Sequence, residues 1–164
     1  GGEYTRQYFS SERYTILATS SRGHSVPIIN GQFQVTGKEK SRIYTETPDN
    51  YAFSMENAYS VPTLTSLKRD IRCKENSVVL TDTYEFSEKP ESIRERFVTF
   101  DAPEKTEAGI KCGDSILKYD GELCDVEFGS EPVIRSSTHS DMLYFVDFVI
   151  RDPQKNDTVT FVFS

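Results

Sequence analysis

Hydrophobic and polar residues alternate along most of this chain in short runs that have the two-residue period of a β-strand. The clearest run is the last one, in which Val159, Phe161 and Phe163 alternate with Thr158 and Thr160. Because successive side chains of a strand point to opposite faces, this run predicts a strand with one buried face and one solvated face.

The runs that predict strands are separated by Gly, Pro, Asn, Asp and Ser at fairly regular spacing. No segment shows sustained helical periodicity, and residues 55–59 are long enough for only one helical turn. Residues 103–109 have the most loop-like composition. The predicted strands cover residues 13–19, 26–29, 32–36, 42–47, 51–55, 64–73, 77–86, 92–100, 115–119, 123–128, 133–138, 143–151 and 158–163.

Parallel strands need long crossover connections, and the sequence predicts no helices that could supply them. We therefore expect an all-β fold class: an antiparallel β-sandwich, or stacked antiparallel sheets, with about 12 strands. At 164 residues the chain is expected to form a single β-sheet domain over residues 1–164.

The strongest local signal lies in the segment SSRGHSVPIINGQFQ, residues 20–34. A type I′ turn needs positive φ at both central residues, and Asn30-Gly31 tolerates this best. The apolar run 26–29 and the alternating run 32–36 then predict the two strands of a hairpin. His24 stands just before this hairpin, so the turn would place one of only two histidines on a fixed scaffold.

Composition narrows the classes of function. The formal net charge is −7, whereas proteins that bind nucleic acid or anionic membranes are normally basic. We therefore expect no nucleic-acid partner and no membrane partner, and no apolar run approaches the length of a transmembrane helix. The three cysteines have no CxxC spacing, which argues against a disulfide framework or a zinc ribbon. Buried free thiols are expected, and one disulfide plus a free thiol stays open.

Few residues suggest chemistry of their own. There is no GxSxG motif and no phosphate-binding glycine loop. Taken alone, His24 is either a hydrogen-bonded structural histidine or a metal ligand, and His139 lies in a polar segment typical of solvent exposure. Basic residues could line one face and hold carboxylate or sulfate groups, or could be ordinary surface charge. These residues are Arg13, Arg22, Arg42, Lys68, Arg69, Arg72, Arg94 and Arg96.

Several segments together resemble the C-terminal β-sheet region of the heparinase II/III family of polysaccharide lyases. The resemblance covers most of the chain and is most specific over residues 24–34, although Ser25 replaces the family's usual Asn after the histidine. The segments are GEYTRQYFSSERYTILATSS (2–21), GHSVPIINGQFQVTG (23–37), MENAYSVPTLTSLKRDIR (55–72) and ERFVTFDAP (95–103).

The resemblance implies the β-sheet portion of a larger enzyme that cleaves uronate-containing polysaccharide by β-elimination. Family members have an N-terminal α/α toroid that carries the catalytic Tyr, so this chain is expected to be inactive alone and to have no catalytic residue of its own. The implied partners are an anionic polysaccharide and the toroid, which is absent from this sequence.

In family members with a structural zinc, the histidine of the hairpin motif is a ligand, and it matches His24. The other ligands fall outside this sequence, so tight zinc binding is expected only in the intact enzyme. Arg22, beside His24, is the expected substrate-binding cation.

Two other interpretations stay open. The chain could be a non-catalytic carbohydrate-binding β-sandwich that uses aromatic and Arg residues on an exposed sheet, or a purely structural sandwich. The sequence also leaves open whether the parent enzyme is secreted, periplasmic or cytoplasmic in a bacterium.

Overall fold

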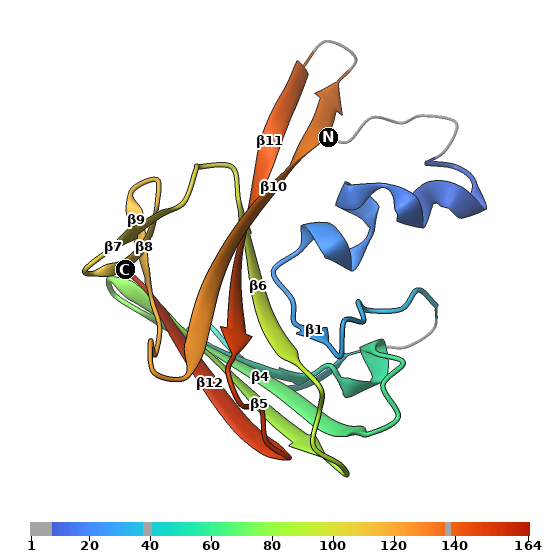
Figure 1. Cartoon of the computed structure of the whole chain (residues 1–164), viewed down its shortest axis with the longest axis vertical. Helices are drawn as coiled ribbons and strands as arrows, with labels where there is room; N and C mark the ends of the chain where they lie inside the picture. The colour runs from blue at the N-terminus through green and yellow to red at the C-terminus, as the bar shows by residue number, and fades with distance from the viewer. Residues whose placement is uncertain (1–7, 38–40, 137–138) are drawn as a thin grey trace.

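The computed structural model describes residues 8–37, 41–136 and 139–164 of the chain. Within these residues, twelve strands form two antiparallel sheets, one of four strands and one of eight, which face each other (Figure 1). The prediction of an all-β fold with about 12 antiparallel strands is confirmed. No helical segment in the described residues is both long and apolar enough to cross a membrane.

The smaller sheet contains a long two-stranded hairpin that extends beyond its neighbouring strand (Figure 1). In order across the sheet, its strands are β1 (Ile28–Ile29), β6 (Ile93–Thr99), β11 (His139–Ile150) and β10 (Cys124–Ser136). The sequence predicted two strands, 123–128 and 133–138, where the structure has only β10. The strand continues through Pro132 because β10 is an edge strand, where a residue without an N–H is tolerated.

The larger sheet holds the other eight strands. In order across the sheet they are β2 (Arg42–Thr47), β3 (Asn50–Ser54), β4 (Leu64–Lys74), β5 (Ser77–Phe86), β12 (Asn156–Phe163), β9 (Ser115–Lys118), β8 (Gly109–Cys112) and β7 (Glu104–Thr106). The segment 103–109, predicted as a loop, contains β7 and leads into β8. Both strands are only three or four residues long, and β7 is a polar edge strand, so an alternation criterion does not detect them.

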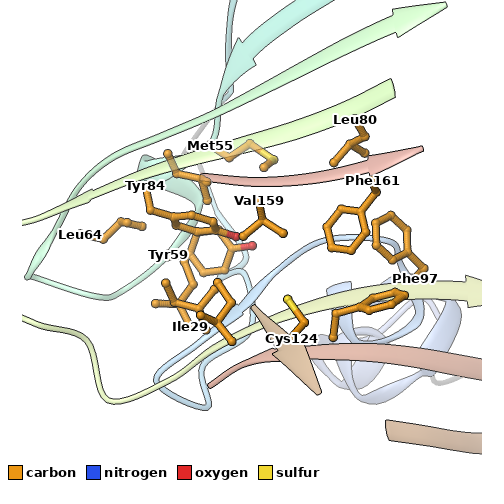
Figure 2. Close-up of a cluster of buried hydrophobic side chains, with 14 of the residues drawn as sticks. Ile29, Met55, Tyr59, Leu64, Leu80, Tyr84, Phe97, Cys124, Val159 and Phe161 are labelled. Carbon is orange, nitrogen blue, oxygen red and sulfur yellow. The ribbon is translucent and has the colours of Figure 1, made fainter. Parts of the chain in front are cut away.

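The main core lies between the two sheets and is filled by the alternate side chains of their inner faces (Figure 2). Phe97 from the smaller sheet packs edge-to-face on Phe161 from the larger sheet, with ring centroids 4.8 Å apart. On β12, Val159 and Phe161 are buried while Thr158 and Thr160 are exposed, as the alternation predicted. Burial of these large side chains is the main favourable term in folding this domain.

The segment before β1 was predicted to contain a strand at residues 13–19, and this prediction is wrong. It forms the short 3-10 helices η1 (Ser11–Thr15), η2 (Leu17–Thr19) and η3 (Ser21–Gly23), beside the smaller sheet (Figure 1). Leu17 packs with Leu143 and Phe145 on the outer face of that sheet. The side chain of Ser10 accepts a hydrogen bond from the Glu12 N–H. Local bonds and one buried side chain therefore override the β-propensity of the segment.

A similar departure follows the hairpin turn. Residues 32–36 were predicted to form a returning strand, but only a single bridge joins Ile29 to Gln32. The chain after Gln32 instead runs alongside the short helix η4 (Glu56–Ala58), and the Val35 N–H donates to the Ala58 carbonyl at 2.8 Å. Backbone pairing with a distant segment therefore replaces the predicted strand pairing.

Candidate functional site

The predicted turn at Asn30-Gly31 is present, with φ of 50° at Asn30 and 70° at Gly31. Its two flanking residues exchange backbone hydrogen bonds of 3.1 and 2.8 Å, and β1 pairs with β6. The Asn30 side-chain oxygen also accepts from the N–H groups of Glu91 and Ser92. The turn is therefore tied to the start of β6 and provides a fixed base for the segment that contains His24.

Ser25 and Pro27, which follow His24 closely in sequence, are held by the body of the sandwich. The Ser25 hydroxyl accepts from the Val98 N–H at 3.1 Å, and the Ser25 carbonyl accepts from Arg69 Nη1 at 2.8 Å. Two residues further on, the Pro27 carbonyl accepts from the Tyr59 hydroxyl at 2.7 Å. Because both sheets contribute donors, the backbone beside His24 has little freedom to move.

His24 and Arg22 line the same pocket, of about 440 Å³, between the 3-10 segment and the chain after the turn. We call it the Arg22–His24 pocket. The Gln34 N–H donates to the Ser21 hydroxyl at 3.0 Å and joins its two walls. The pocket is lined by Tyr14, Thr19, Ser20, Ser21, Arg22, His24, Phe33, Gln34, Val35, Thr36 and Gly37. The structure thus brings together the two site residues predicted from the sequence, with aromatic rings beside them.

Arg22 already has an ion-pair partner beside this pocket. Its Nη2 donates to both carboxylate oxygens of Glu131 on β10, at 2.8 and 3.0 Å. The two side chains are 40% and 43% exposed, and pairs at such sites contribute at most about 1 kcal/mol. The Arg22 carbonyl also accepts from Arg96 Nη1 at 3.2 Å. An anionic ligand would therefore have to compete with Glu131 for the guanidinium, at modest cost.

His24 is exposed in the pocket. Within residues 8–37, 41–136 and 139–164, no group of three His, Cys, Asp or Glu side chains is placed to hold a metal ion. A structural zinc needs four ligands and a catalytic zinc three. The described residues therefore do not form a zinc site by themselves, and His24 would need ligands from outside them. The side chain of His139 lies outside the described residues.

Beneath the Ser25 backbone lies a group of buried polar side chains. Of these, only Arg69 was a candidate from the sequence, as a cation on an exposed face, whereas it is buried. We call Arg69, Asp82, Tyr84 and Glu95 the buried charged cluster. Asp82, Tyr84 and Glu95 are fully buried, and Arg69 is 5% exposed. Arg69 Nε and Nη2 donate to the Asp82 carboxylate at 2.8 and 2.5 Å, and Tyr84 donates to Glu95 Oε1 at 2.5 Å.

The cluster spans the two sheets, with Glu95 on β6 facing Arg69 and Asp82 on β4 and β5. Arg69 Nη2 lies 3.6 Å from Glu95 Oε2, an oxygen that has no hydrogen-bond partner. Burial, together with the nearby Asp82 charge, raises the pKa of Glu95 well above its usual range. The folded structure therefore favours the protonated form of Glu95 over the ionised form.

The tyrosines around the cluster also keep their protons. Burial, followed by the charge of Glu95, raises the pKa of both Tyr84 and Tyr59. Figure 2 shows the hydroxyls of these two tyrosines pointing to the same side of the core. Although burial opposes its charge, the bonds to Asp82 raise the pKa of Arg69, which stays a cation. The Ser25 carbonyl is thus held by a permanent charge.

A signal for this cluster exists in the sequence. In each of three strands, a charged residue occupies a position where strand alternation predicts an apolar residue. Arg69 stands between Leu67 and Ile71, and the same pattern surrounds Asp82 and Glu95. Charged side chains are almost never fully buried unless they are paired, so three such interruptions indicate that they meet. The sequence does not show which partners meet.

The fold of this chain is similar to that of solved heparan sulfate lyases. Heparan sulfate lyase HepC from Pedobacter heparinus matches 88% of the chain with a TM-score of 0.65 and 12% sequence identity. A mutant of the same lyase matches with a TM-score of 0.63, and a heparinase III with methylated lysines matches with 0.53 at 11% identity. The chain spans about a quarter of the length of these lyases, 24% of HepC.

No protein-family model and no curated protein sequence matches the chain. At 11–12% identity the structural likeness establishes a shared fold. The class that the fold defines is therefore a β-sheet domain of the kind found in heparan sulfate lyases.

Proposed function

We propose that this chain is the β-sheet part of a heparinase II/III-like lyase that cleaves uronate-containing polysaccharide by β-elimination. The observation that carries the proposal is the fold likeness to HepC over 88% of the chain. Because the chain corresponds to 24% of that lyase, the rest of the enzyme would supply the catalytic residues. The isolated chain would then be inactive and act only when joined to the helical toroid.

In this proposal the Arg22–His24 pocket forms one wall of the substrate cleft. β-Elimination removes the proton on C5, which the adjacent uronate carboxylate acidifies, and negative charge develops on that carboxylate. A cation near it stabilises the transition state more than the ground state. Arg22 is the proposed cation. Its guanidinium would pair with Glu131 before the substrate binds and with the substrate carboxylate afterwards.

We also propose His24 as one zinc ligand of the intact enzyme. Its exposure at the pocket and its firmly held neighbour Ser25 support this role. Bound zinc would bring the chain and the segment that supplies its other ligands into a fixed arrangement. Among the described residues, His24 is the one imidazole that lines the pocket, so we expect the chain alone to bind zinc weakly.

Equilibrium dialysis against zinc tests this role. We would compare the 164-residue chain with the longer lyase polypeptide that contains it, each with native His24 and with His24→Ala, and with His139→Ala as the matched control. Tight binding by the longer polypeptide alone, lost only with His24→Ala, is the expected result. Equal zinc binding by the native and His24→Ala polypeptides would show that His24 is not a zinc ligand and has only a structural role.

Paired variants of the longer enzyme test Arg22. Arg22→Gln removes the cation, whereas Glu131→Gln removes its competitor and leaves the cation in place. We expect Arg22→Gln to reduce kcat/KM about tenfold or more, since charge-assisted hydrogen bonds contribute about 1.5–3 kcal/mol. We expect Glu131→Gln to leave kcat/KM unchanged or to raise it. If both variants behave like the native enzyme, Arg22 does not contact the substrate.

A further inference from the structure

The outer face of the larger sheet carries a second groove, separate from the Arg22–His24 pocket. Strand alternation places Lys68 and Asp70 of β4 and Thr81 and Thr83 of β5 on this face, which is turned away from β6 (Figure 1). The groove has a volume of about 340 Å³. It is lined by Tyr44, Ala52, Phe53, Lys68, Arg69, Asp70, Thr81 and Thr83.

Tyr44 forms one wall of this groove because of an irregularity in β2. The register between β2 and β3 shifts between Ile43 and Thr45, which places Tyr44 in a β-bulge. Its side chain is 52% exposed. Arg42 Cζ lies 5.4 Å from the Tyr44 ring centroid, and Lys68 Nζ lies 5.8 Å from it. One exposed ring thus contacts two cationic side chains, of which Lys68 lines the groove itself.

Among the described residues, Arg42 and Lys68 differ from most of the other candidate basic residues of the sequence in their lack of a carboxylate partner. Five of those residues pair with carboxylates: Arg22, Arg69, Arg72, Arg94 and Arg96. Arg13 stacks on the rings of Tyr8 and Tyr14. Within the part of the chain that the structure describes, Arg42 and Lys68 are in no ion pair. In a chain of net charge −7, this groove is a local site of unneutralised positive charge.

We propose that this groove binds an anionic saccharide outside the reaction site. Lys68 would hold a sulfate or carboxylate group, with Arg42 adding positive charge beside the same ring, and the side of the Tyr44 ring would pack against the apolar face of a sugar ring. The hydroxyls of Thr81 and Thr83 and the Asp70 carboxylate, at the other end, would bond sugar hydroxyls. The choice of a sulfated or uronate sugar rests on the proposed function, and the groove itself rests on geometry.

Charge distribution favours a short saccharide over a nucleic acid. A nucleic acid presents one phosphate per nucleotide and needs a continuous basic surface. Here two free cations are followed by Asp70, whose carboxylate pairs with Arg72 at 2.8 Å. The mixture of two cations, threonine hydroxyls and one acid matches a ligand with one anionic group and several neutral hydroxyls. Because the ring already restrains both cations, ordering them on binding would cost little.

The test is a two-dimensional amide NMR titration of the 164-residue chain with a heparan sulfate tetrasaccharide of defined sulfation. The expected result is a set of shifts centred on the amides of Ala52, Lys68 and Thr81. Lys68→Gln should weaken binding about tenfold, the size of one lost charge-assisted contact. Tyr44→Ala should weaken it as well, since it removes the ring that holds both cations.

Lys118→Gln is the matched control, because Lys118 is an exposed lysine on the same face of the sheet, on β9. We expect it to bind like the native chain. Thermal midpoints of all three variants should stay near the native value, because the altered side chains are exposed.

Three results would overturn the proposal: no shifts at the groove amides, equal losses for Lys68→Gln and Lys118→Gln, or equal affinity for a short single-stranded DNA. The zinc experiment on His24 uses the longer enzyme, whereas this titration uses the 164-residue chain alone. The two experiments therefore test the two proposals separately. Saccharide binding at the groove can be disproved while the lyase proposal holds, and the lyase proposal can be disproved while saccharide binding holds.

Discussion

At the scale of single residues, the buried Glu95 links the core to pH. Its carboxyl group is fully buried, accepts a hydrogen bond from Tyr84 and lies near Asp82 and Arg69. Burial raises the pKa of Glu95 because an ionised form would be a second unsolvated anion beside Asp82. The folded chain therefore binds a proton that the unfolded chain releases above a pH of about 4.3.

This linkage predicts how stability changes with pH. In the window between the unfolded and the raised folded pKa, the native state binds more protons, so Glu95 makes the free energy of unfolding fall as pH rises. Glu95→Gln should remove this contribution and make the chain more stable than native at pH 8. Urea unfolding between pH 5 and 9 measures both effects.

The exposed Glu127→Gln is the control for Glu95→Gln, and it should keep the native slope. A native-like slope in Glu95→Gln would show instead that Glu95 is ionised in the folded state.

Gly31 gives a second prediction at this scale. Its φ of 70° is in the left-handed region, and a Cβ added there would have no atom within 4 Å. Strain rather than collision therefore sets the cost of a side chain. Gly31→Val should lower the free energy of unfolding by about 1–2 kcal/mol or somewhat more, because β-branched residues tolerate positive φ badly.

Gly31→Asn tests the cause of that loss, since Asn tolerates this region better and should cost clearly less. Chemical denaturation measures the free energy of unfolding of both variants. Equal losses for Val and Asn would mean that backbone conformation is not what the position requires.

At the scale of elements, the cross-strand pair of Arg69 and Asp82 joins β4 to β5 and also holds the hairpin segment. The two residues are direct partners in the β4–β5 register, and Arg69 reaches on to the Ser25 carbonyl. A buried pair of this kind contributes little net stability compared with apolar residues, but breaking one half leaves an unpaired charge in the core.

Arg69→Met should therefore destabilise the chain by about 3–5 kcal/mol. The double variant Arg69→Met with Asp82→Leu should recover most of that loss in a urea unfolding experiment. The exposed pair of Lys89 and Asp152 provides the control, and Lys89→Met should have little effect. If the double variant were no better than Arg69→Met, the loss would reflect packing and not an unpaired charge.

The elements also show where strand prediction works. The predicted strands 42–47 and 77–86 coincide with β2 and β5, because turn residues bound them on both sides. The prediction for 13–19 is wrong although its residues favour strands. That segment lies on the outer face of the smaller sheet, where no neighbouring strand offers it backbone partners. Strand formation needs a partner, and local sequence cannot supply one.

At the scale of the whole molecule, the three cysteines differ in how deeply they are buried, and none of them is in a disulfide. Cys73 is exposed, near the end of β4. Cys112 is partly buried, and burial together with Asp101 raises the pKa of its thiol. Cys124 is 2% exposed, and burial, with the nearby Glu95, raises its pKa to about 12. The thiolate is the nucleophile that attacks a thiol reagent, so both burial and the raised pKa protect Cys124.

We therefore expect thiol labelling at pH 8 to follow the order Cys73, Cys112, Cys124. Mass spectrometry of peptides over time gives each rate, and Cys124 should react only when the two sheets separate. Its rate should then rise with urea in parallel with the unfolded fraction. Labelling of Cys124 at the rate of Cys112, without denaturant, would show that the sandwich opens locally near β10.

The sequence by itself determined the all-β class, most strand positions and the Asn30-Gly31 turn. These features depend on alternation and turn chemistry within a few residues of each other, so a local pattern carries them. His24 and Arg22 were named as candidate site residues from the sequence because His24 matches a family motif and Arg22 lies beside it, and their roles stay predictions.

Only the tertiary structure decided which residues meet. Arg22 pairs with Glu131, 109 residues away, and Arg69 holds the Ser25 carbonyl from 44 residues away. Glu95 joins a charged pair on the opposite sheet, and the Tyr44 ring contacts the cationic groups of both Arg42 and Lys68. The order of strands in the two sheets sets these contacts. That order follows from packing the whole inner surface at once, which no short stretch of sequence specifies.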